Sequence, residues 1–464
     1  MLRASEACER AGFPTSSLVC EGFLSQAAAT SVGLGMPNLP VATIVGHPGA
    51  QSVEEIRQNA FNVTAAQVID NLLTQPAETE LPSEPKARDI VFRGTFEAVN
   101  EYFNERDWSG GLPIVPPTIE KIEEFLSYTD RKPEESLGIV LPESRAVTIW
   151  SIAANGVMAG CKPEYMPILV ALGEAMADPT YGVEHSGNTP GAETLIILNG
   201  PIIKELKFNY EQGAMRDGFL ANTSVGRFWR LALRNIAGFL LHKTDKGTYG
   251  NTFRVVLAEN EGAIAKIGWQ PHSVDMGFNA GDNTVTITRL TGGGVLPSVT
   301  GSTPQTMMPY LADGVAKQTG WEISFTVGGL SIGTLRPILI LSPILAETIA
   351  KAGWKKEDVK QYLYDHARME AWRVETMMDK WVDFRIGSLQ RQVNLGRLPK
   401  DFYESDDPKR LVPIVVNRDD FIVLVSGDPL RTNAYAFTHN GHLGFPVAKK
   451  IRLPENWSER IKKP

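Results

Sequence analysis

The chain has 464 residues, more than one compact core usually holds, and its length indicates two or three domains. Its 43% hydrophobic and 21% charged residues are typical of a folded protein, and the net charge of −7 with no basic patch argues against a nucleic-acid partner. No apolar run approaches the roughly 20 residues that cross a bilayer, and the N-terminal segment has no signal-peptide core. We therefore expect a cytoplasmic protein with no membrane partner.

The cysteine content is low, and it excludes a disulfide framework. The three cysteines, Cys8, Cys20 and Cys161, are also not spaced as in a zinc motif. Together with the composition, this predicts a cytoplasmic enzyme or enzyme subunit.

Residues 1–75 predict a small α/β unit. Helices are expected over 4–11 and 23–32 and strands over 14–19 and 40–45, followed by a long helix that Ser52 caps. Two strands make too small a parallel sheet to stand alone, because parallel strands are normally buried on both faces. The first helix also has no strand before it. We therefore expect a further strand to come from elsewhere in the chain or from another polypeptide.

Residues 76–92 have linker composition, and residues 93–464 predict one large α/β catalytic domain. The fold class is thus α/β, with an incomplete, Rossmann-like parallel-sheet unit before the large domain. Helices are expected over 96–104, 118–127, 163–176, 225–241, 306–318, 345–351 and 357–368. Strands are expected over 195–199, 254–257, 284–288, 323–327, 337–341, 411–416 and 421–425.

Cys161 is the most suggestive thiol. It follows an apolar helical stretch and precedes Lys162 and Pro163, and the proline suits the first position of a new helix. A helix N-terminus and a neighbouring lysine both favour the thiolate, which is the reactive form. The alternative is a small buried residue at a helix corner.

Cys20 and His47 end the two strands of the first unit. Ligand sites in open α/β sheets lie beyond the carboxyl ends of the strands, so both side chains are candidates for one crevice. Ordinary loop positions are the alternative.

Acidic residues and a histidine follow the strand expected at 254–257. Glu259, Asn260 and Glu261 stand in a predicted loop, and His272 and Asp275 come shortly after. Carboxylates with a histidine suit general acid–base catalysis or a divalent metal site, whereas a solvated loop is the simpler interpretation.

The glycine-rich stretch 292–305 contains Ser302 and Thr303 and leads into a predicted helix. Its backbone amides would suit an anion, although a lid or a plain loop fits equally well. Ser331 lies in a GxSxG pattern without the strand–helix context of a hydrolase, and we interpret it as a turn residue. His439 and His442 have metal-like spacing in a Gly/Asn turn.

Three arginines are spaced along one face of the helix expected at 225–241. Arg227, Arg230 and Arg234 stand at i, i+3 and i+7, and Asn222 and Asn235 lie nearby. Arginine binds carboxylates in a bidentate manner, so Arg230 and Arg234 are candidates for a substrate clamp, with a salt-bridged helix face as the alternative.

Residues 4–75 resemble the later part of the UGSC-motif family, through the Gly12-Phe13-Pro14-Thr15 turn, the strand running to Phe23 and the His47-Pro48 pair before an acidic helix. Most of 95–450 resembles a large domain that accompanies UGSC-type sequences. The matching segments are WSGGLPIVPPT, ANGVMAGCKPEYMPILVAL, ANTSVGRFWRLALRNIAG, AENEG and PILAETIAKAGWKKEDV.

In that family an opening strand ends in a selenocysteine- or cysteine-Gly-Ser-Cys signature, which this sequence lacks. The resemblance thus implies thiol- or selenol-linked chemistry, and we expect a small separate subunit to supply the strand; a homo-oligomer is the other partner considered. Reversible oxidation and nucleophilicity of such groups suit reduction or sulfur transfer.

The resulting hypothesis is a heteromeric enzyme subunit acting on a small anionic organic substrate at a composite site. Cys161 is the expected nucleophile or redox thiol, and Glu259, Glu261 and His272 handle protons or a metal. Substrate contacts are assigned to Arg230, Arg234, Asn222, Asn260, Ser302, Thr303, His47 and Cys20. The first rival is a metal-dependent lyase or hydratase, in which Glu and His side chains bind a divalent ion; the second is a non-catalytic assembly subunit.

Overall fold

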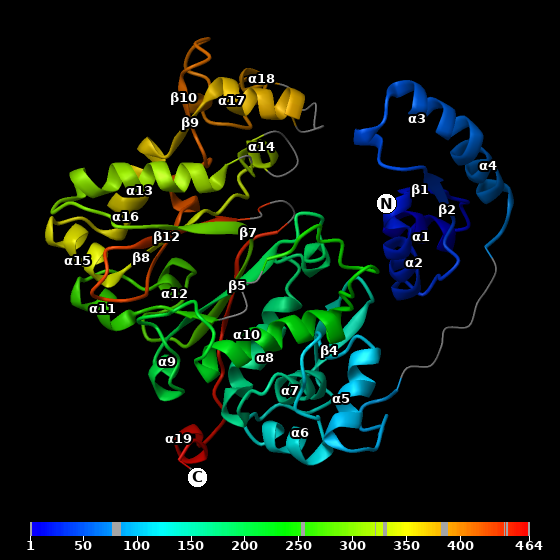
Figure 1. Cartoon of the computed structure of the whole chain (residues 1–464), viewed down its shortest axis with the longest axis horizontal. Helices are drawn as coiled ribbons and strands as arrows, with labels where there is room; N and C mark the ends of the chain where they lie inside the picture. Colours follow the sequence, from blue (N-terminus) through cyan, green and yellow to red (C-terminus); the bar gives the residue numbers. More distant parts are fainter. Residues whose placement is uncertain are drawn as a thin grey trace.

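The computed structural model describes residues 2–76, 85–251, 256–320, 322–327, 332–381, 388–439, 441 and 444–462. It shows an α/β protein in which a small N-terminal unit, residues 2–76, lies beside a larger main body, residues 93–462 (Figure 1). No helix within the described ranges is long and apolar enough to cross a membrane.

The N-terminal unit has the expected alternation of helices and strands. Its elements are α1 (Leu2–Arg10), β1 (Ser17–Cys20), α2 (Leu24–Gly33), β2 (Val41–Ile44), α3 (Val53–Asn59), the π-helical turn η3 (Ala60–Thr64) and α4 (Ala65–Leu73). β1 and β2 pair in parallel, from Ser17 opposite Val41 to Cys20 opposite Ile44. The hydroxyl of Ser52 accepts from the amide of Glu55 at the start of α3, which confirms the predicted cap.

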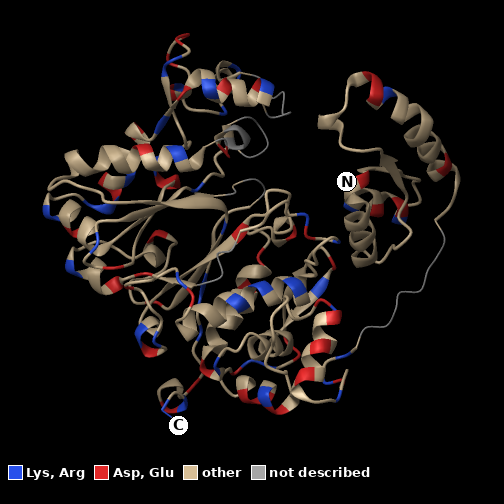
Figure 2. Ribbon diagram, viewed as in Figure 1, with Lys and Arg blue, Asp and Glu red and all other residues tan. Residues whose placement is uncertain are grey.

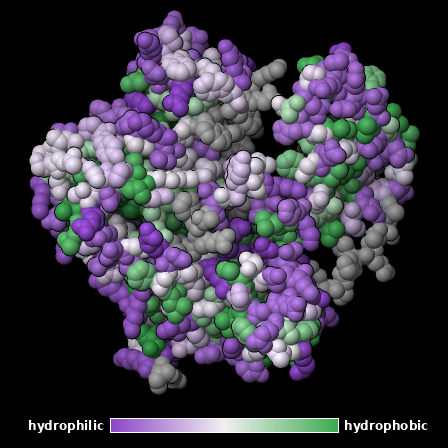
Figure 3. All heavy atoms as spheres, viewed as in Figure 1, coloured by the Kyte–Doolittle hydropathy of each residue, from purple (hydrophilic) through white to green (hydrophobic). Residues whose placement is uncertain are grey.

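This unit has almost no core of its own. The buried residues within 2–76 are few and mostly small, namely Ser17, Ala27, Ser31, Leu39, Pro40 and Ala42. Several large apolar side chains are instead exposed, and Figure 3 shows apolar patches on its surface. They include Phe13, Leu18, Val53, Phe61 and Leu73. Since burial of apolar surface is the main stabilising contribution, the unit gains little stability from its own packing.

The first part of the main body is a helical layer with one hairpin. Its elements are α5 (Phe96–Glu105), α6 (Ile119–Leu126), β3 (Ser136–Val140), β4 (Arg145–Thr148), α7 (Ile149–Met158), α8 (Met166–Met176) and α10 (Leu220–Ala232). Nearly every residue of α8 is buried, because α8 packs between α7 and strands of the central sheet.

The central sheet has the strand order β11-β8-β12-β7-β5-β6, with β13 also paired to β7. These strands are β5 (Glu193–Asn199), β6 (Val256–Ala258), β7 (Thr284–Leu296), β8 (Ile338–Leu341), β11 (Ile422–Val425), β12 (Ala434–His439) and β13 (Val447–Lys450). β5 runs parallel to β6 and β8 parallel to β11, whereas β7 is antiparallel to β5, β12 and β13.

The sheet curls until its two edge strands meet. The amide of Asn260, just after β6, donates to the carbonyl of Val425 in β11 at 2.8 Å, and the Ser426 hydroxyl donates to the carbonyl of Ala258 at 2.9 Å. Alternate strand residues point inward and outward, so Leu195 and Ile197 of β5 join an interior cluster, while the outward residues contact the helices.

The outer face of β8, β11 and β12 carries a second helical layer. It consists of α13 (Pro304–Thr319), α15 (Pro343–Lys351), α16 (Lys356–His366) and α17 (Ala371–Thr376), and it has its own apolar cluster. The remaining elements are η1 (Glu21–Phe23), η2 (Pro48–Ala50), η4 (Pro163–Tyr165), η5 (Val183–His185), α9 (Ile202–Glu205), η6 (Leu233–Ala237), α11 (Glu261–Lys266), α12 (His272–Asp275), α14 (Glu322–Val327), β9 (Arg368–Glu370), η7 (Met377–Trp381), α18 (Leu389–Asn394), η8 (Lys400–Phe402), β10 (Leu411–Pro413), η9 (Arg418–Asp420) and α19 (Trp457–Arg460).

Two elements of the main body differ from expectation. The strand predicted at 323–327 is wrong, because the segment is the helix α14. The glycine-rich segment 292–305 is not a loop throughout, since Gly292–Gly294 lie in β7 and pair with β12. A side chain at Gly293 would meet the Phe437 ring and the carbonyl of Ala436, so glycine serves close packing there.

Candidate functional site: an arginine-lined pocket

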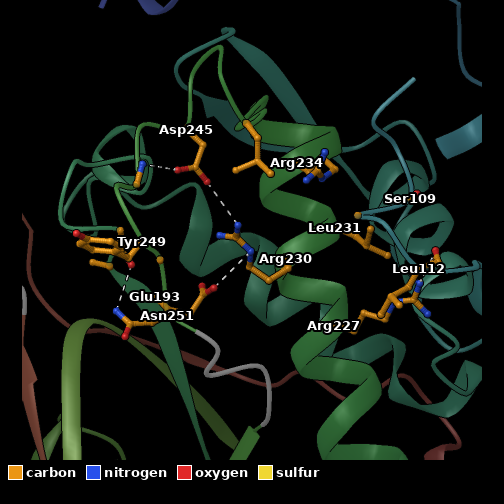
Figure 4. Close-up of a pocket in the computed structure, with 16 residues that line it drawn as sticks. Ser109, Leu112, Glu193, Arg227, Arg230, Leu231, Arg234, Asp245, Tyr249 and Asn251 are labelled. Carbon is orange, nitrogen blue, oxygen red and sulfur yellow. Dashed lines mark hydrogen bonds and ion pairs between the residues drawn. The ribbon is translucent and has the colours of Figure 1, made fainter. Parts of the chain in front are cut away.

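Arg227 and Arg230 stand on α10, and Arg234 stands on the π-helical turn η6 that follows. Figure 2 shows basic positions recurring along α10. The helical spacing places the three arginines on one face, and all three line a single pocket of about 300 Å³ (Figure 4). Its other lining residues come from α10 itself and from three other segments, 109–112, 191–193 and 241–251: Ser109, Gly110, Leu112, Gly191, Ala192, Glu193, Leu231, Leu241, Asp245, Gly247, Tyr249, Gly250 and Asn251. We call this the arginine pocket.

Arg230 is held between two carboxylates. Its Nε lies 3.4 Å from Oε2 of Glu193, the first residue of β5, and its Nη2 lies 3.5 Å from Oδ2 of Asp245 (Figure 4). Glu193 is almost fully buried, so the Arg230–Glu193 ion pair is partly shielded from solvent. Arg230 therefore carries a charge that is already matched.

Arg227 is placed differently. Its Nη2 donates to the carbonyls of Leu112 and Pro113, at 3.3 and 2.7 Å, and among the described residues no carboxylate forms an ion pair with it. Burial lowers the pKa of Arg227, because the charged guanidinium is partly removed from water. Its charge is thus desolvated, fixed in position by backbone oxygens, and not balanced by an acidic side chain of the described chain.

Arg234 donates from Nη1 to the carbonyl of Asp107 at 2.8 Å, and the same atom lies 3.9 Å from the Asp107 carboxylate. Three arginines and two carboxylates are therefore among the described residues that line the pocket, and by this count one positive charge is in excess. Such a lining suits an organic anion, because the planar guanidinium groups match a carboxylate.

The sheet of the N-terminal unit has one occupied and one open edge. The outer edge of β2 is bonded by side chains of the following helices: Gln67 accepts from the amide of Thr43, and the Thr64 hydroxyl donates to its carbonyl. In β1 the Ser17 amide donates toward β2, so Leu18 and Cys20 face away. In the described part of the chain, the Leu18 backbone groups have no hydrogen-bond partner.

Cys20 is the last residue of β1 and His47 follows β2, and the two strand ends lie side by side, as the sequence predicts. Nδ1 of the His47 ring accepts from the amide of Gly49 at 3.1 Å and so caps η2. Glu21 accepts from the amide of Gly46 at 3.1 Å and joins the two loops. No described contact holds the Cys20 thiol.

The model of the UGSC family matches residues 1–74. Because the match covers the N-terminal unit, we call it the UGSC unit. The match confirms the resemblance seen in its Gly-Phe-Pro-Thr turn and His-Pro pair, while the link to an accompanying large domain stays a prediction. No curated protein and no solved structure matches the chain.

The main body contacts the UGSC unit at one described ion pair. Nη1 of Arg3 lies 3.4 Å from Oε1 of Glu184, in the segment that leads on to Gly191 and Glu193 of the arginine pocket. A side chain at Gly33 of the UGSC unit would also collide with the backbone of Pro142. The UGSC unit therefore lies against η5 and the turn between β3 and β4.

Cys161 does not have the environment that the sequence suggests. Its thiol is buried, and burial raises the pKa of Cys161 to about 12, which the neighbouring Ser224 side chain and the charge of Arg227 only partly oppose. The prediction of a thiolate at neutral pH is therefore wrong. The helix start at Pro163 does not compensate for the hydration that a buried thiolate would lose. Cys161 packs in the apolar cluster as a neutral thiol.

The acidic residues after β6 come together, but inside the protein. Glu259 accepts from the Asn199 side chain at 2.7 Å and from the amide of His272 at 2.8 Å. Glu261 accepts from the Asn199 side chain at 3.1 Å and the amide of Gly200 at 2.8 Å, and burial raises its pKa despite these bonds. The expected solvent-facing loop is thus wrong, because these carboxylates tie the end of β6 to that of β5.

His272 and Asp275 extend this group toward the outer helices. Nδ1 of His272 lies 4.0 Å from Oδ2 of Asp275, and the same oxygen lies 3.1 Å from Nζ of Lys356 and 3.7 Å from Nζ of Lys360. Both ring nitrogens of His272 lack a hydrogen-bond partner in the described residues. Among the described residues, no group of three or more His, Cys, Asp or Glu side chains is arranged to hold a metal.

Three of the four remaining predicted contact residues of the main body have structural roles. Asn222 is buried and bonds the backbone of Asn209 and Val256, and Asn260 accepts from the amide of Ala263 to cap α11. Thr303 forms the cap of α13, and Ser302 is exposed beside it. These four residues do not line the arginine pocket.

The two remaining motifs fall partly outside the described residues. Ser331 and His442 lie outside the described residues. His439 is buried in β12, where its Nδ1 accepts from the amide of Arg336 at 3.2 Å, and burial lowers the pKa of His439 to about 3. It is therefore neutral at physiological pH.

The sequence points to the arginines of the pocket but not to the residues around them. Glu193, Asp245 and Tyr249 carry no motif, and their place in the pocket follows from the fold. The Ser109–Leu112 wall belongs to the WSGGLPIVPPT segment, so two of the segments named in the resemblance meet at this pocket.

Proposed function

We propose that this chain is the substrate-binding subunit of a thiol- or selenol-linked enzyme that acts on a small organic anion. The observation that carries the proposal is Arg227, a partly buried guanidinium in a pocket with excess positive charge and with no acidic partner among the described residues. A buried charge is costly unless it is paired, so a negatively charged group of a ligand would complete this site.

The reactive group is proposed to come from the UGSC unit and a partner rather than from Cys161. Support comes from the family match, from Cys20 at the carboxyl end of β1, and from the open outer edge of that strand. A partner strand that added to this edge, parallel to β1, would deliver a cysteine or selenocysteine next to Cys20. Reduction or sulfur transfer is the class of reaction that such groups serve.

Calorimetric titration of the full chain with acetate, methylphosphonate and sulfate tests the anion site. We expect binding that Arg227→Gln weakens at least tenfold, because the unmatched charge is lost. The control Arg57→Gln removes an exposed arginine of the UGSC unit and should leave the affinity unchanged. Equal affinities of wild type and Arg227→Gln would contradict the proposal.

Native mass spectrometry of the protein from its own host tests the composite site separately. We expect a mass above an integer multiple of 50.9 kDa by one small polypeptide. A clean multiple of the chain mass would exclude a separate strand donor. Replacing Leu18 by proline removes an outward-facing amide and should abolish the added mass if the strand docks at β1.

A further inference from the structure

We infer that the ligand of the arginine pocket is a monocarboxylate that carries an apolar body; this inference rests on the proposed function. The pocket has two unlike sides (Figure 4). Arg227 stands with Leu112 and Leu231 on one side, and Glu193, Asp245 and Tyr249 stand on the other, with Arg230 between them.

The first side fixes the carboxylate and the apolar body. The carbonyls of Leu112 and Pro113 hold the Arg227 guanidinium, so a carboxylate bound there lies beside the Leu112 side chain. Leu231 forms a buried floor, while Leu112 is 56% and Leu241 is 54% exposed. When a ligand covers large apolar side chains that line a pocket and still face water, the free energy of the complex falls.

Tyr249 offers a further apolar surface on the opposite side of the pocket. This residue is 96% exposed and lines the same pocket. An exposed aromatic ring at the mouth of a pocket is free to pack against a flat apolar group. The volume of about 300 Å³ is at the lower end of the range for small-molecule sites, which limits the ligand to a small acid.

The second side limits the ligand to one negative charge. Glu193 and Asp245 share the single guanidinium of Arg230, at 3.4 and 3.5 Å, so among the described residues the far side of the pocket has no unpaired cation. A second carboxylate there would face two carboxylates, and like charges at close range repel. A dicarboxylate should thus gain nothing from its second charge.

Titration calorimetry with acetate, phenylacetate and succinate tests this inference on the full chain. We expect phenylacetate to bind at least tenfold more tightly than acetate, about 1.4 kcal/mol, and succinate no more tightly than acetate. Leu112→Ser should remove most of the preference for phenylacetate over acetate. Leu430→Ser, at an exposed leucine that does not line the pocket, is the matched control.

The outcomes separate this inference from the proposal beneath it. If acetate and phenylacetate bind equally to wild type, the apolar body is wrong while the anion site stands. If succinate binds more tightly than phenylacetate, the restriction to one charge is wrong. If none of the three acids binds, the anion site and the ligand class both fail.

Discussion

Arg230 Nε lies 3.4 Å from Oε2 of Glu193, and this ion pair uses up one of the three positive charges in the arginine pocket. Glu193 lies on the side of the pocket opposite Arg227 (Figure 4). Arg230 therefore has carboxylate partners, whereas Arg227 has none among the described residues. The pocket is therefore polarised, and each prediction about its ligand depends on this difference between neighbouring arginines.

Glu193→Gln should make the pocket accept a second negative charge. Removing this carboxylate leaves Arg230 with Asp245 alone, so the affinity for succinate should rise several-fold relative to that for acetate. The exchange also removes one partner of a buried pair, and a loss of about 3 kcal/mol in the free energy of unfolding is expected. Calorimetry and urea unfolding measure the two effects; an unchanged succinate-to-acetate ratio contradicts the assignment.

Cys161 should resist alkylation in the folded protein. Its thiol is buried and its pKa is raised to about 12, so almost no thiolate exists at pH 8. Exposed Cys8 should react with iodoacetamide first, and mass spectrometry of peptides gives the order. After unfolding in urea, Cys161 should react like the other two. Rapid labelling of native Cys161 would restore it as a candidate nucleophile.

Asp275 should contribute to stability in a pH-dependent way. Burial alone would raise the pKa of Asp275, but contacts with His272, Lys356 and Lys360 outweigh it and hold the pKa at about 2. Because the folded pKa is below the ordinary value of about 3.9, its contribution is present above pH 4 and is lost as the pH falls toward 2.

Asp275→Asn should therefore lower the free energy of unfolding at pH 7 by about 3–5 kcal/mol, since two buried lysines lose their partner. The difference from wild type should shrink at pH 3, which urea unfolding at the two pH values measures. Asp313→Asn, at an exposed residue of α13, is the control and should have little effect at either pH.

The sequence predicted most of the helices and the presence of three arginines on one face of α10 and the turn that follows it. Residue spacing alone brings Arg227, Arg230 and Arg234 together, because a helix repeats every 3.6 residues. Cys161 shows the limit of this reasoning: the helix start after it is real, but burial, which depends on packing between distant segments, decides its pKa. Burial likewise turns the polar segment around Glu259 into an internal cluster.

The prediction of a loop for the glycine-rich segment 292–305 was wrong in part for a related reason. Consecutive glycines usually indicate a loop, yet Gly292–Gly294 continue β7 and pair with β12, and Phe437 and Tyr435 of β12 cover Gly293. Such close packing against a partner strand more than a hundred residues away leaves no local signal in the sequence.

Gly293→Ala should therefore destabilise the central sheet. The added methyl group would lie 2.5 Å from the Phe437 ring and 2.8 Å from the Ala436 carbonyl, and overpacking of this kind costs about 1–3 kcal/mol. Gly292→Ala is the matched control, because nothing lies within 4 Å of that position. Thermal unfolding should separate the two variants, and equal melting temperatures would contradict the packing argument.

The central claim is that Arg227 holds an organic anion, and titration calorimetry of phenylacetate against wild type and Arg227→Gln tests it most directly. The account predicts a saturable heat of binding for wild type and at least a tenfold weaker affinity for Arg227→Gln, with an unchanged melting temperature in the absence of ligand. Equal affinities, or no binding by a folded wild-type protein, would contradict it.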